Sequence, residues 1–153
     1  MLTAFLITAA TFFVMEGVTW LTHKYIMHGL LWILHEDHHQ PRRKVFEKND
    51  WFFVIFAVPA MLLFAAGTYV PGKQFLFFIG LGITLYGAAY FIVHDIIIHQ
   101  RFRLFTRSRN FYVRAIRKAH KVHHKHLGKE DGECFGMLWV PLRYFREALK
   151  TAV

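Results

Sequence analysis

Apolar residues in this chain are concentrated in three long stretches, at about 2–22, 51–70 and 75–93. In a helix, about 20 apolar residues at 1.5 Å rise per residue cover the ~30 Å hydrocarbon core of a bilayer. Each stretch has roughly that length, so we expect three transmembrane helices. Pro59 lies near the middle of the second stretch, where we expect a kink and not a break, because neighbouring helices can satisfy the freed carbonyl.

The polar segments beside these stretches define how the helices connect. The sequence Pro71-Gly72-Lys73-Gln74 separates the second stretch from the third and indicates a tight hairpin.

The first stretch begins at the N-terminus, which raises the alternative of a signal peptide. It lacks a basic segment before the apolar run and a small-residue cleavage site after it. We therefore expect a retained transmembrane helix.

Basic residues lie almost entirely on one side of the expected spans. Of the 19 Lys and Arg residues, five lie in 23–50 and thirteen after residue 100, while the hairpin holds only Lys73. The positive-inside rule therefore places 23–50 and 94–153 in the cytoplasm and the N-terminus outside. Residues 101–153 are too polar to span a membrane, and we expect them to lie at the interface or to cap the bundle.

The expected fold class is an all-α integral membrane protein with about three transmembrane helices and a cytoplasmic, histidine-rich helical cap. We expect residues 1–153 to form one membrane-embedded domain. The composition agrees, because 55% of residues are hydrophobic and only 19% are charged, yet the net charge is +9. The single cysteine, Cys134, excludes a disulfide framework, a CxxC redox pair and a cysteine-held iron–sulfur cluster. Any metal chemistry must therefore rest on histidine.

Ten of the eleven histidines fall into four groups, each close to a predicted membrane exit or in the cytoplasmic segments that follow. Two groups have HxxxxH spacing and two have HxxHH spacing. We predict all ten as metal ligands: His23 and His28; His35, His38 and His39; His94 and His99; His120, His123 and His124. His126 lies outside every group, and we expect it to be solvated or interfacial.

The spacing within the groups predicts how many ions they hold. Positions i, i+3 and i+4 of HxxHH lie within an arc of ~100° on one helix face. Positions i and i+5 of HxxxxH are ~140° apart on a regular helix, so they require two metals or a distorted helix end. Gly29, just after His28, is a plausible helix end that lets the next group fold back. Ten imidazoles exceed the needs of one ion, so we predict two.

Imidazole ligands suit iron, zinc, copper and nickel, so ligand type alone leaves the metal open. The membrane location and the lack of cysteine ligands favour oxygen chemistry over a structural zinc site. One alternative is that the histidines only decorate a basic interfacial surface. Another is a non-enzymatic, histidine-rich membrane protein that binds or carries metal, although a transporter should place its ligands near the bilayer midplane.

The residues in and around these groups resemble the bacterial β-carotene hydroxylases, a branch of the fatty-acid hydroxylase and sterol desaturase superfamily. The likeness covers nearly the whole chain. It rests on His23-Lys-Tyr-Ile-Met-His28, His35-Glu-Asp-His38-His39, His94-Asp-Ile-Ile-Ile-His99-Gln-Arg101, Ala119-His120-Lys-Val-His123-His124, Met15-Glu16, Phe46-Glu47-Lys48-Asn49-Asp50, Gly128-Lys129-Glu130 and Phe135-Gly136.

This resemblance implies a non-haem di-iron monooxygenase that uses O₂ to hydroxylate C3 of the β-ionone rings of β-carotene, giving β-cryptoxanthin and zeaxanthin. It implies two Fe, a carotenoid taken from the lipid phase and an external electron donor such as ferredoxin. The chain has no GxGxxG motif, in keeping with an external donor. We expect a multi-pass protein of the bacterial inner (cytoplasmic) membrane with its active site on the cytoplasmic side, surrounded by membrane lipids and without a nucleic-acid partner.

The histidine groups are shared across the superfamily, so other activities stay open: a fatty-acid or sterol hydroxylase, or a carotenoid ketolase that acts at the neighbouring ring carbon. The oligomeric state also stays open.

Two acidic residues are further site candidates. Asp95 follows His94 and can orient a ligand imidazole, or it can pair with Arg101 or Arg103. Glu16 is the only ionisable residue inside the first predicted span and is costly to expose to lipid. It lies seven residues before His23, within ~20° of the same helix face. We expect Glu16 to face the bundle beside the substrate route, or to hydrogen-bond a hydroxyl such as Tyr86 or Tyr90.

Overall fold

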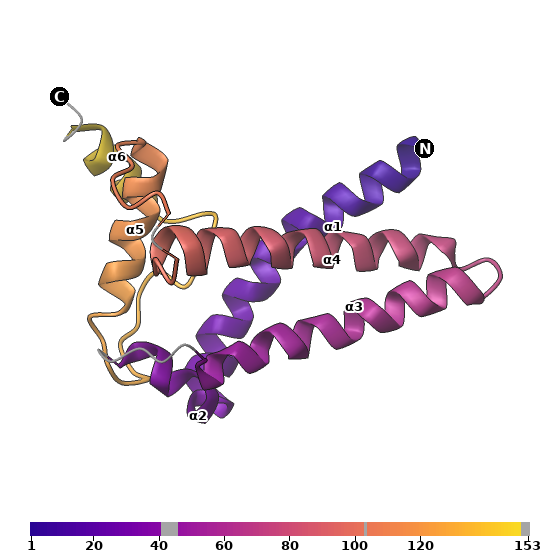
Figure 1. The fold of residues 1–153 in the computed structure, drawn as a ribbon, viewed down its shortest axis with the longest axis horizontal. Helices are drawn as coiled ribbons and strands as arrows, with labels where there is room; N and C mark the ends of the chain where they lie inside the picture. The colour runs from indigo at the N-terminus through magenta and orange to yellow at the C-terminus, as the bar shows by residue number, and fades with distance from the viewer. Residues whose placement is uncertain (41–45, 103, 151–153) are drawn as a thin grey trace.

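The computed structural model describes residues 1–40, 46–102 and 104–150, and every regular element within them is helical (Figure 1). The long helices are α1 (Leu2–Leu21), α3 (Trp51–Tyr69) and α4 (Gln74–Tyr90). The π-helical segments η1 (Thr22–Leu30) and η4 (Phe91–Ile98) extend α1 and α4. The shorter elements are α2 (Trp32–His35), the 3₁₀ turns η2 (Glu36–His39) and η3 (Lys48–Asp50), and the helices α5 (Phe111–His123) and α6 (Leu142–Lys150).

Three helical stretches are long and apolar enough to cross a membrane: Leu2–Leu30, Lys48–Tyr69 and Gln74–Ile98. Large apolar side chains on these stretches point outward as well as inward. Phe5, Phe13, Ile55 and Leu62 are all exposed in the isolated chain. A helix that is apolar on every side belongs in lipid or in a large core. The predicted fold class, an all-α membrane protein with three spans, is therefore confirmed.

Helix α4 lies at the centre, and α1 and α3 each pack against it. Glycine allows the close approach at both contacts. A Cβ on Gly82 would lie 2.7 Å from the Thr8 carbonyl oxygen of α1, and a Cβ on Gly67 of α3 would collide with the Phe77 nitrogen of α4. Small residues at helix contacts are the usual way for membrane helices to gain packing contacts.

The α3–α4 connection is the tight hairpin that the sequence predicts. The Lys73 amide donates to the Val70 carbonyl, and Gly72 has a φ of +77°. This is the pattern of a type II turn, in which proline at the second position and glycine at the third are favoured. Helix α3 continues through Pro59.

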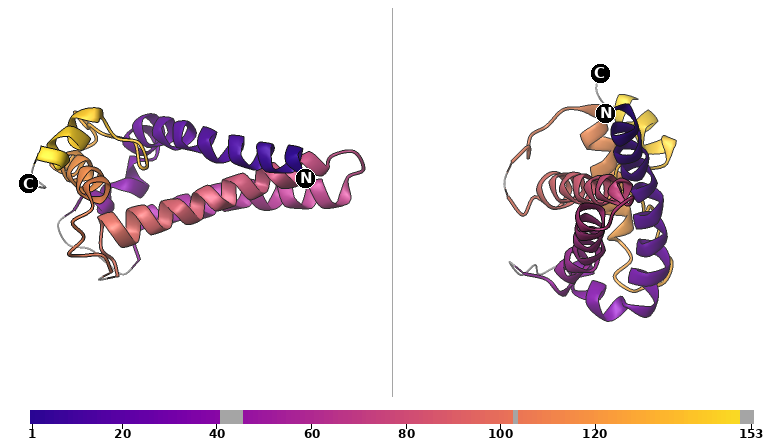
Figure 2. Two further views of the ribbon diagram at one scale, coloured as in Figure 1. Left: turned by 90° about the horizontal axis from the view of Figure 1, so that it is seen from above. Right: turned by 90° about the vertical axis from the view of Figure 1, so that its right-hand side faces the viewer.

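Helices α5 and α6 form the cap, at the end of the molecule opposite the N-terminus and the α3–α4 turn (Figures 1 and 2). Asn110 begins α5 by accepting hydrogen bonds from the amides of Tyr112 and Val113, the usual N-cap arrangement. The two helices share a small buried core formed by Ala115, Ile116, Ala119, Val140, Tyr144 and Ala148. The buried side of α5 also carries His120 and His123.

Candidate metal centre

The two HxxxxH pairs lie where the long helices change to π-helical geometry. The His99 amide donates to the His94 carbonyl at 2.8 Å, and the Leu31 amide donates to the Ile26 carbonyl at 2.8 Å. Both bonds join residues i and i+5, the defining bond of a π turn. The wider π turn brings residues five apart closer to one helix face than an α-helix does, so both rings of each pair converge. Of the two alternatives that the spacing left open, two metals or a distorted helix end, the distorted helix end is present at both pairs.

Gly29 redirects the chain after the first pair. Its φ of −127° and ψ of −111° are not helical, and α2 and η2 follow at once. This confirms the expected role of Gly29 and brings the first HxxHH group back to the rings of η1.

Ring nitrogens of five buried histidines meet in what we call the first cluster. The ligand atoms lie within 4.8 Å of one another, and they come from η1, α2, η2 and α5. The members are His23, His28, His35, His39 and His123.

A second cluster is formed by His38, His94, His99 and His120, again with ligand atoms within 4.8 Å of one another. The Nε2 atom of His124 lies 2.9 Å from that of His120, which places a fifth, half-buried ring at its edge. All ten predicted ligands therefore lie in or beside two clusters, which matches the number of ions predicted.

Each HxxHH group is divided between the clusters. The expected helix face of three imidazoles occurs only in the second group, at the end of α5. His35 and His39 belong to the first cluster, whereas His38 between them belongs to the second. The first group is not on a regular helix, because α2 ends at His35 and η2 is a 3₁₀ turn. The clusters are adjacent, since the rings of His39 and His124 stack with centroids 4.5 Å apart.

In the first cluster, an oxygen atom holds every ring by its Nδ1 atom. His35 Nδ1 lies 2.7 Å from Asn49 Oδ1. The other four rings bond to main-chain carbonyls: His23 to Phe135, His28 to Lys129, His39 to His126 and His123 to Glu133. Because these oxygens only accept, Nδ1 carries the proton on each ring, and each neutral ring presents a bare Nε2 lone pair.

These lone pairs face one another at short range. The Nε2 atoms of His23 and His39 each lie 3.2 Å from that of His35. With no proton between them, such atoms repel unless a cation lies among them. Imidazole nitrogens bind first-row metals at about 2.0–2.1 Å, so two of them at right angles around one ion are about 3 Å apart. The residues therefore fit a metal ion.

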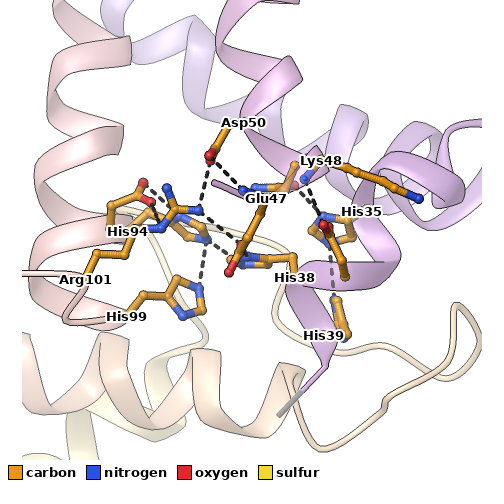
Figure 3. Close-up of polar contacts among 12 residues, drawn as sticks. His35, His38, His39, Glu47, Lys48, Asp50, His94, His99 and Arg101 are labelled. Atoms are coloured by element: carbon orange, nitrogen blue, oxygen red, sulfur yellow. Dashed lines mark hydrogen bonds and ion pairs between the residues drawn. The ribbon is translucent and has the colours of Figure 1, made fainter. Parts of the chain in front are cut away.

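Carboxylates hold two rings of the second cluster (Figure 3). His38 Nδ1 lies 2.7 Å from Glu47 Oε2, and His94 Nδ1 lies 3.2 Å from Asp95 Oδ2. Arg101 joins these carboxylates, because its Nη2 is 3.1 Å from Glu47 Oε2 and its Nε is 2.9 Å from Asp95 Oδ1. The same guanidinium contacts Asp50 at 2.9 Å. His120 Nδ1 has no partner among the described residues, so this ring is held from its Nε2 side.

Burial keeps the cap histidines neutral. It lowers the pKa of His39 to about 4 and that of His123 to about 3. Burial also lowers the pKa values of His35, His38 and His120 well below the usual value. Neutral imidazole is the form that binds metals, so these rings are ready to act as ligands near pH 7. Burial raises the pKa of Glu47, against the opposing effect of Arg101.

An apolar cavity of about 250 Å³ lies beside the first cluster. It is bounded by α1, α3 and α4 and by the loop before α6. Its walls include Phe52, Phe56, Ala60, Ile83 and Gly87, and His23 and Asn49 also line it. No ring of the second cluster lines it. An apolar group in this cavity would therefore meet the first cluster.

Glu16 faces the bundle, as expected, and Tyr86 donates to its Oε2 at 2.6 Å. The tyrosine was one of two expected partners. Glu16 also makes three hydrogen bonds that the sequence did not predict. Its Oε1 accepts the amides of Met137, Leu138 and Trp139 at 2.9–3.0 Å. Glu16 therefore ties the loop before α6 to α1.

The remaining candidates also have defined surroundings. Asp95 makes both of its expected contacts, to His94 and to Arg101, while Arg103 lies outside the described residues. The His126 side chain belongs to neither cluster, but its carbonyl holds His39.

Sequence reasoning missed the roles of Glu47, Asn49 and Asp50, and it named Arg101 only as a partner of Asp95. These residues lie in segments that carry the family resemblance, and that resemblance was the feature of the sequence that could have marked them as site residues.

Comparisons with known proteins agree with this geometry. The family model described as "Fatty acid hydroxylase" matches residues 8–142. A protein of Pseudescherichia vulneris named "Beta-carotene hydroxylase" is 44% identical over 139 residues, which is 91% of this chain and 78% of the relative. A protein of the same name from Paracoccus sp. (strain PC1) is 41% identical over 92% of this chain and 86% of its own length.

A longer relative, "Beta-carotene 3-hydroxylase, chloroplastic" of Haematococcus lacustris, is 42% identical over 83% of this chain and 40% of its own length. No solved structure matches the chain significantly. The family model and the bacterial relatives both span the four histidine groups. With its ten histidines in two facing clusters under three membrane helices, this chain belongs to the fatty acid hydroxylase family.

Proposed function

We propose that this protein is an O₂-dependent di-iron monooxygenase that hydroxylates C3 of the β-ionone rings of β-carotene, giving β-cryptoxanthin and then zeaxanthin. The names of the relatives support the carotene ring as substrate. The single observation that carries the proposal is the position of the apolar cavity. It lies between membrane helices and is lined at one place by His23 of the first cluster.

The ten histidines would hold two iron ions. When bound, such a pair supplies O₂ activation and the oxidising power to hydroxylate an unactivated C–H bond. The protein contributes fixed positions. Oxygen partners on Nδ1 hold each ring of the first cluster in one orientation and one tautomer, so the Nε2 atoms stay aimed at the centre.

The cavity would orient the substrate. A terminal ring fits among apolar side chains of α1, α3 and α4, and the long polyene stays in the lipid between the helices. The walls also exclude water from the reacting carbon. Glu16 supports this arrangement, because the loop that it holds continues from Phe135, whose carbonyl orients His23.

Electrons would come from an external donor such as ferredoxin. The single cysteine excludes a built-in iron–sulfur cluster held by several cysteines. Exposed Lys121 and Lys125 lie beside the histidines of α5, where positive charge attracts an acidic donor. The same charge supports a location in the bacterial cytoplasmic membrane with the histidine clusters on the cytoplasmic side.

The test is expression in a bacterium that accumulates β-carotene, followed by chromatography of the pigments. We expect β-cryptoxanthin and zeaxanthin. Ketocarotenoids would identify a ketolase instead, and unchanged β-carotene with normal membrane insertion would contradict carotenoid hydroxylation.

Alanine at any one of six histidines should abolish the products while insertion continues: His35, His38, His39, His120, His123 and His124. If most of these variants keep normal yields, the two-metal assignment is wrong.

Gly87 offers a separate test of the cavity. A Cβ on Gly87 meets nothing within 4 Å, so Gly87→Leu should fill the cavity without disturbing the fold. We expect at least a tenfold lower zeaxanthin yield with unchanged metal content. Gly17 of α1 also has open space at its Cβ but does not line this cavity, so Gly17→Leu is the matched control. Equal yields from the two variants would argue against substrate binding here.

A further inference from the structure

The two clusters differ in the groups that hold their rings. In the first cluster all five Nδ1 partners are uncharged: four carbonyls and the Asn49 amide. In the second cluster the partners of His38 and His94 are carboxylates. Both carboxylates are buried, with 2% and 1% of their side-chain surfaces exposed for Glu47 and Asp95. Solvent therefore screens their charge little.

This difference has two effects on a cation. A carboxylate that accepts the Nδ1 proton draws that proton away from the ring and makes the Nε2 atom a stronger donor to a metal. The surrounding charge acts in the same direction. Glu47, Asp50 and Asp95 face one guanidinium, that of Arg101 (Figure 3), so the network carries excess negative charge beside the second cluster.

We propose that the second cluster binds its metal ion more tightly than the first, and that Glu47 and Asp95 are the positioning residues that create this difference. The two ions of the pair are then inequivalent. The more weakly bound ion lies in the first cluster, beside the apolar cavity. This inference rests on the metal pair of the proposed function.

The experiment is a titration of the metal-free, detergent-solubilised full chain with Co²⁺, followed by the visible absorption of bound Co²⁺. For the unmodified chain we expect two ions bound in two resolved phases, each with its own absorption band. Glu47→Gln keeps the shape and an accepting oxygen but removes the charge. We expect it to weaken the tighter phase by about 10–100-fold and to shift the band of that phase, with the other phase unchanged.

Three variants complete the test. Asp95→Asn should repeat the effect of Glu47→Gln through a different ring, which keeps the test decisive if one variant folds poorly. Asn49→Asp places a carboxylate behind His35 and should tighten the weaker phase. Glu130→Gln removes the same charge at an exposed site whose partner is Lys129, so it should change neither phase.

The outcomes separate this inference from the function on which it rests. A chain that binds fewer than two Co²⁺ ions contradicts the metal pair, and this inference with it. Two ions bound with equal affinity, or Glu47→Gln and Asp95→Asn weakening both phases equally, contradict the inequivalence alone.

Discussion

At Glu16, one carboxyl group connects the first membrane helix to two distant segments. One oxygen accepts the Tyr86 hydroxyl of α4, and the other accepts three consecutive main-chain amides at 137–139. This oxygen is the shared acceptor of the three amides, and leaving a buried donor unpaired costs about 1–3 kcal/mol. The same loop continues back to Phe135, which orients His23. Glu16 thus acts on the first cluster through the main chain.

This connection predicts opposite outcomes for two substitutions. Glu16→Gln keeps a carbonyl oxygen for the amides and a polar group for Tyr86, so we expect activity within about threefold of the unmodified enzyme. Glu16→Leu removes every acceptor, and we expect a lower melting temperature and at least tenfold less hydroxylated product. Thermal melting, metal content and pigment analysis measure these effects. If Glu16→Leu inserts normally, binds the full metal complement and keeps the unmodified rate, Glu16 has neither role.

At the scale of elements, the π-helical ends and the glycine contacts place the ligands. The π turns bring residues five apart toward one face, so η1 and η4 with its C-cap each place two rings in one cluster. The height and rotation of those rings depend on how α1 packs on α4. Gly82 permits that contact, because a Cβ there would lie 2.6 Å from the Thr11 Cβ.

Gly82→Ala should therefore displace α1 and its histidines. We expect a loss of stability of about 1–3 kcal/mol, as for other overpacked contacts, together with a lower metal-to-protein ratio. Gly17→Ala on α1 is the control, since its Cβ meets nothing within 4 Å and alanine favours the helix. The melting temperature and the iron content of the purified proteins check both variants. A stable, fully metallated Gly82→Ala protein would show that the α1–α4 contact does not set the site.

At the scale of the whole molecule, all the histidine chemistry lies at one end. The N-terminus and the α3–α4 turn lie at the other end (Figure 2). Lys24 of η1 lies over the rings of Trp20 and Tyr25, the kind of aromatic and basic group found at a membrane interface. The location of the histidines at one end and the distribution of Lys and Arg together predict that the cap lies in the cytoplasm.

Cysteine labelling tests the predicted topology. In a Cys134→Ser background, a single cysteine at Lys73→Cys should react with a membrane-impermeant maleimide in intact spheroplasts. A cysteine at Lys125→Cys should react only after permeabilisation, because the positive-inside rule places the cap in the cytoplasm. Labelling of intact spheroplasts at position 125 but not at 73 would reverse the orientation.

The sequence by itself determined the fold class, the three apolar helices, the hairpin turn and the four histidine groups. These features depend on local pattern, since an apolar run of 20 residues or a glycine in a turn has the same meaning in most surroundings. The sequence also allowed the partner of Glu16 on α4 to be predicted, because an ionisable group inside a span must find a polar neighbour.

Only the tertiary structure decided which histidines share a cluster and what holds them. HxxHH spacing suggested three rings on one face, but the 3₁₀ turn at 36–39 and the opposed position of α5 divide each group between two clusters. Four of the rings are held by the main-chain carbonyls of residues 126, 129, 133 and 135. Every residue has such a carbonyl, so the residue types in the sequence do not reveal these contacts. Glu47 and Asn49 become ring partners only when η3 packs beside η2. The physical reason is that a hydrogen bond between distant segments depends on where the whole backbone places both groups, and local spacing does not encode that placement.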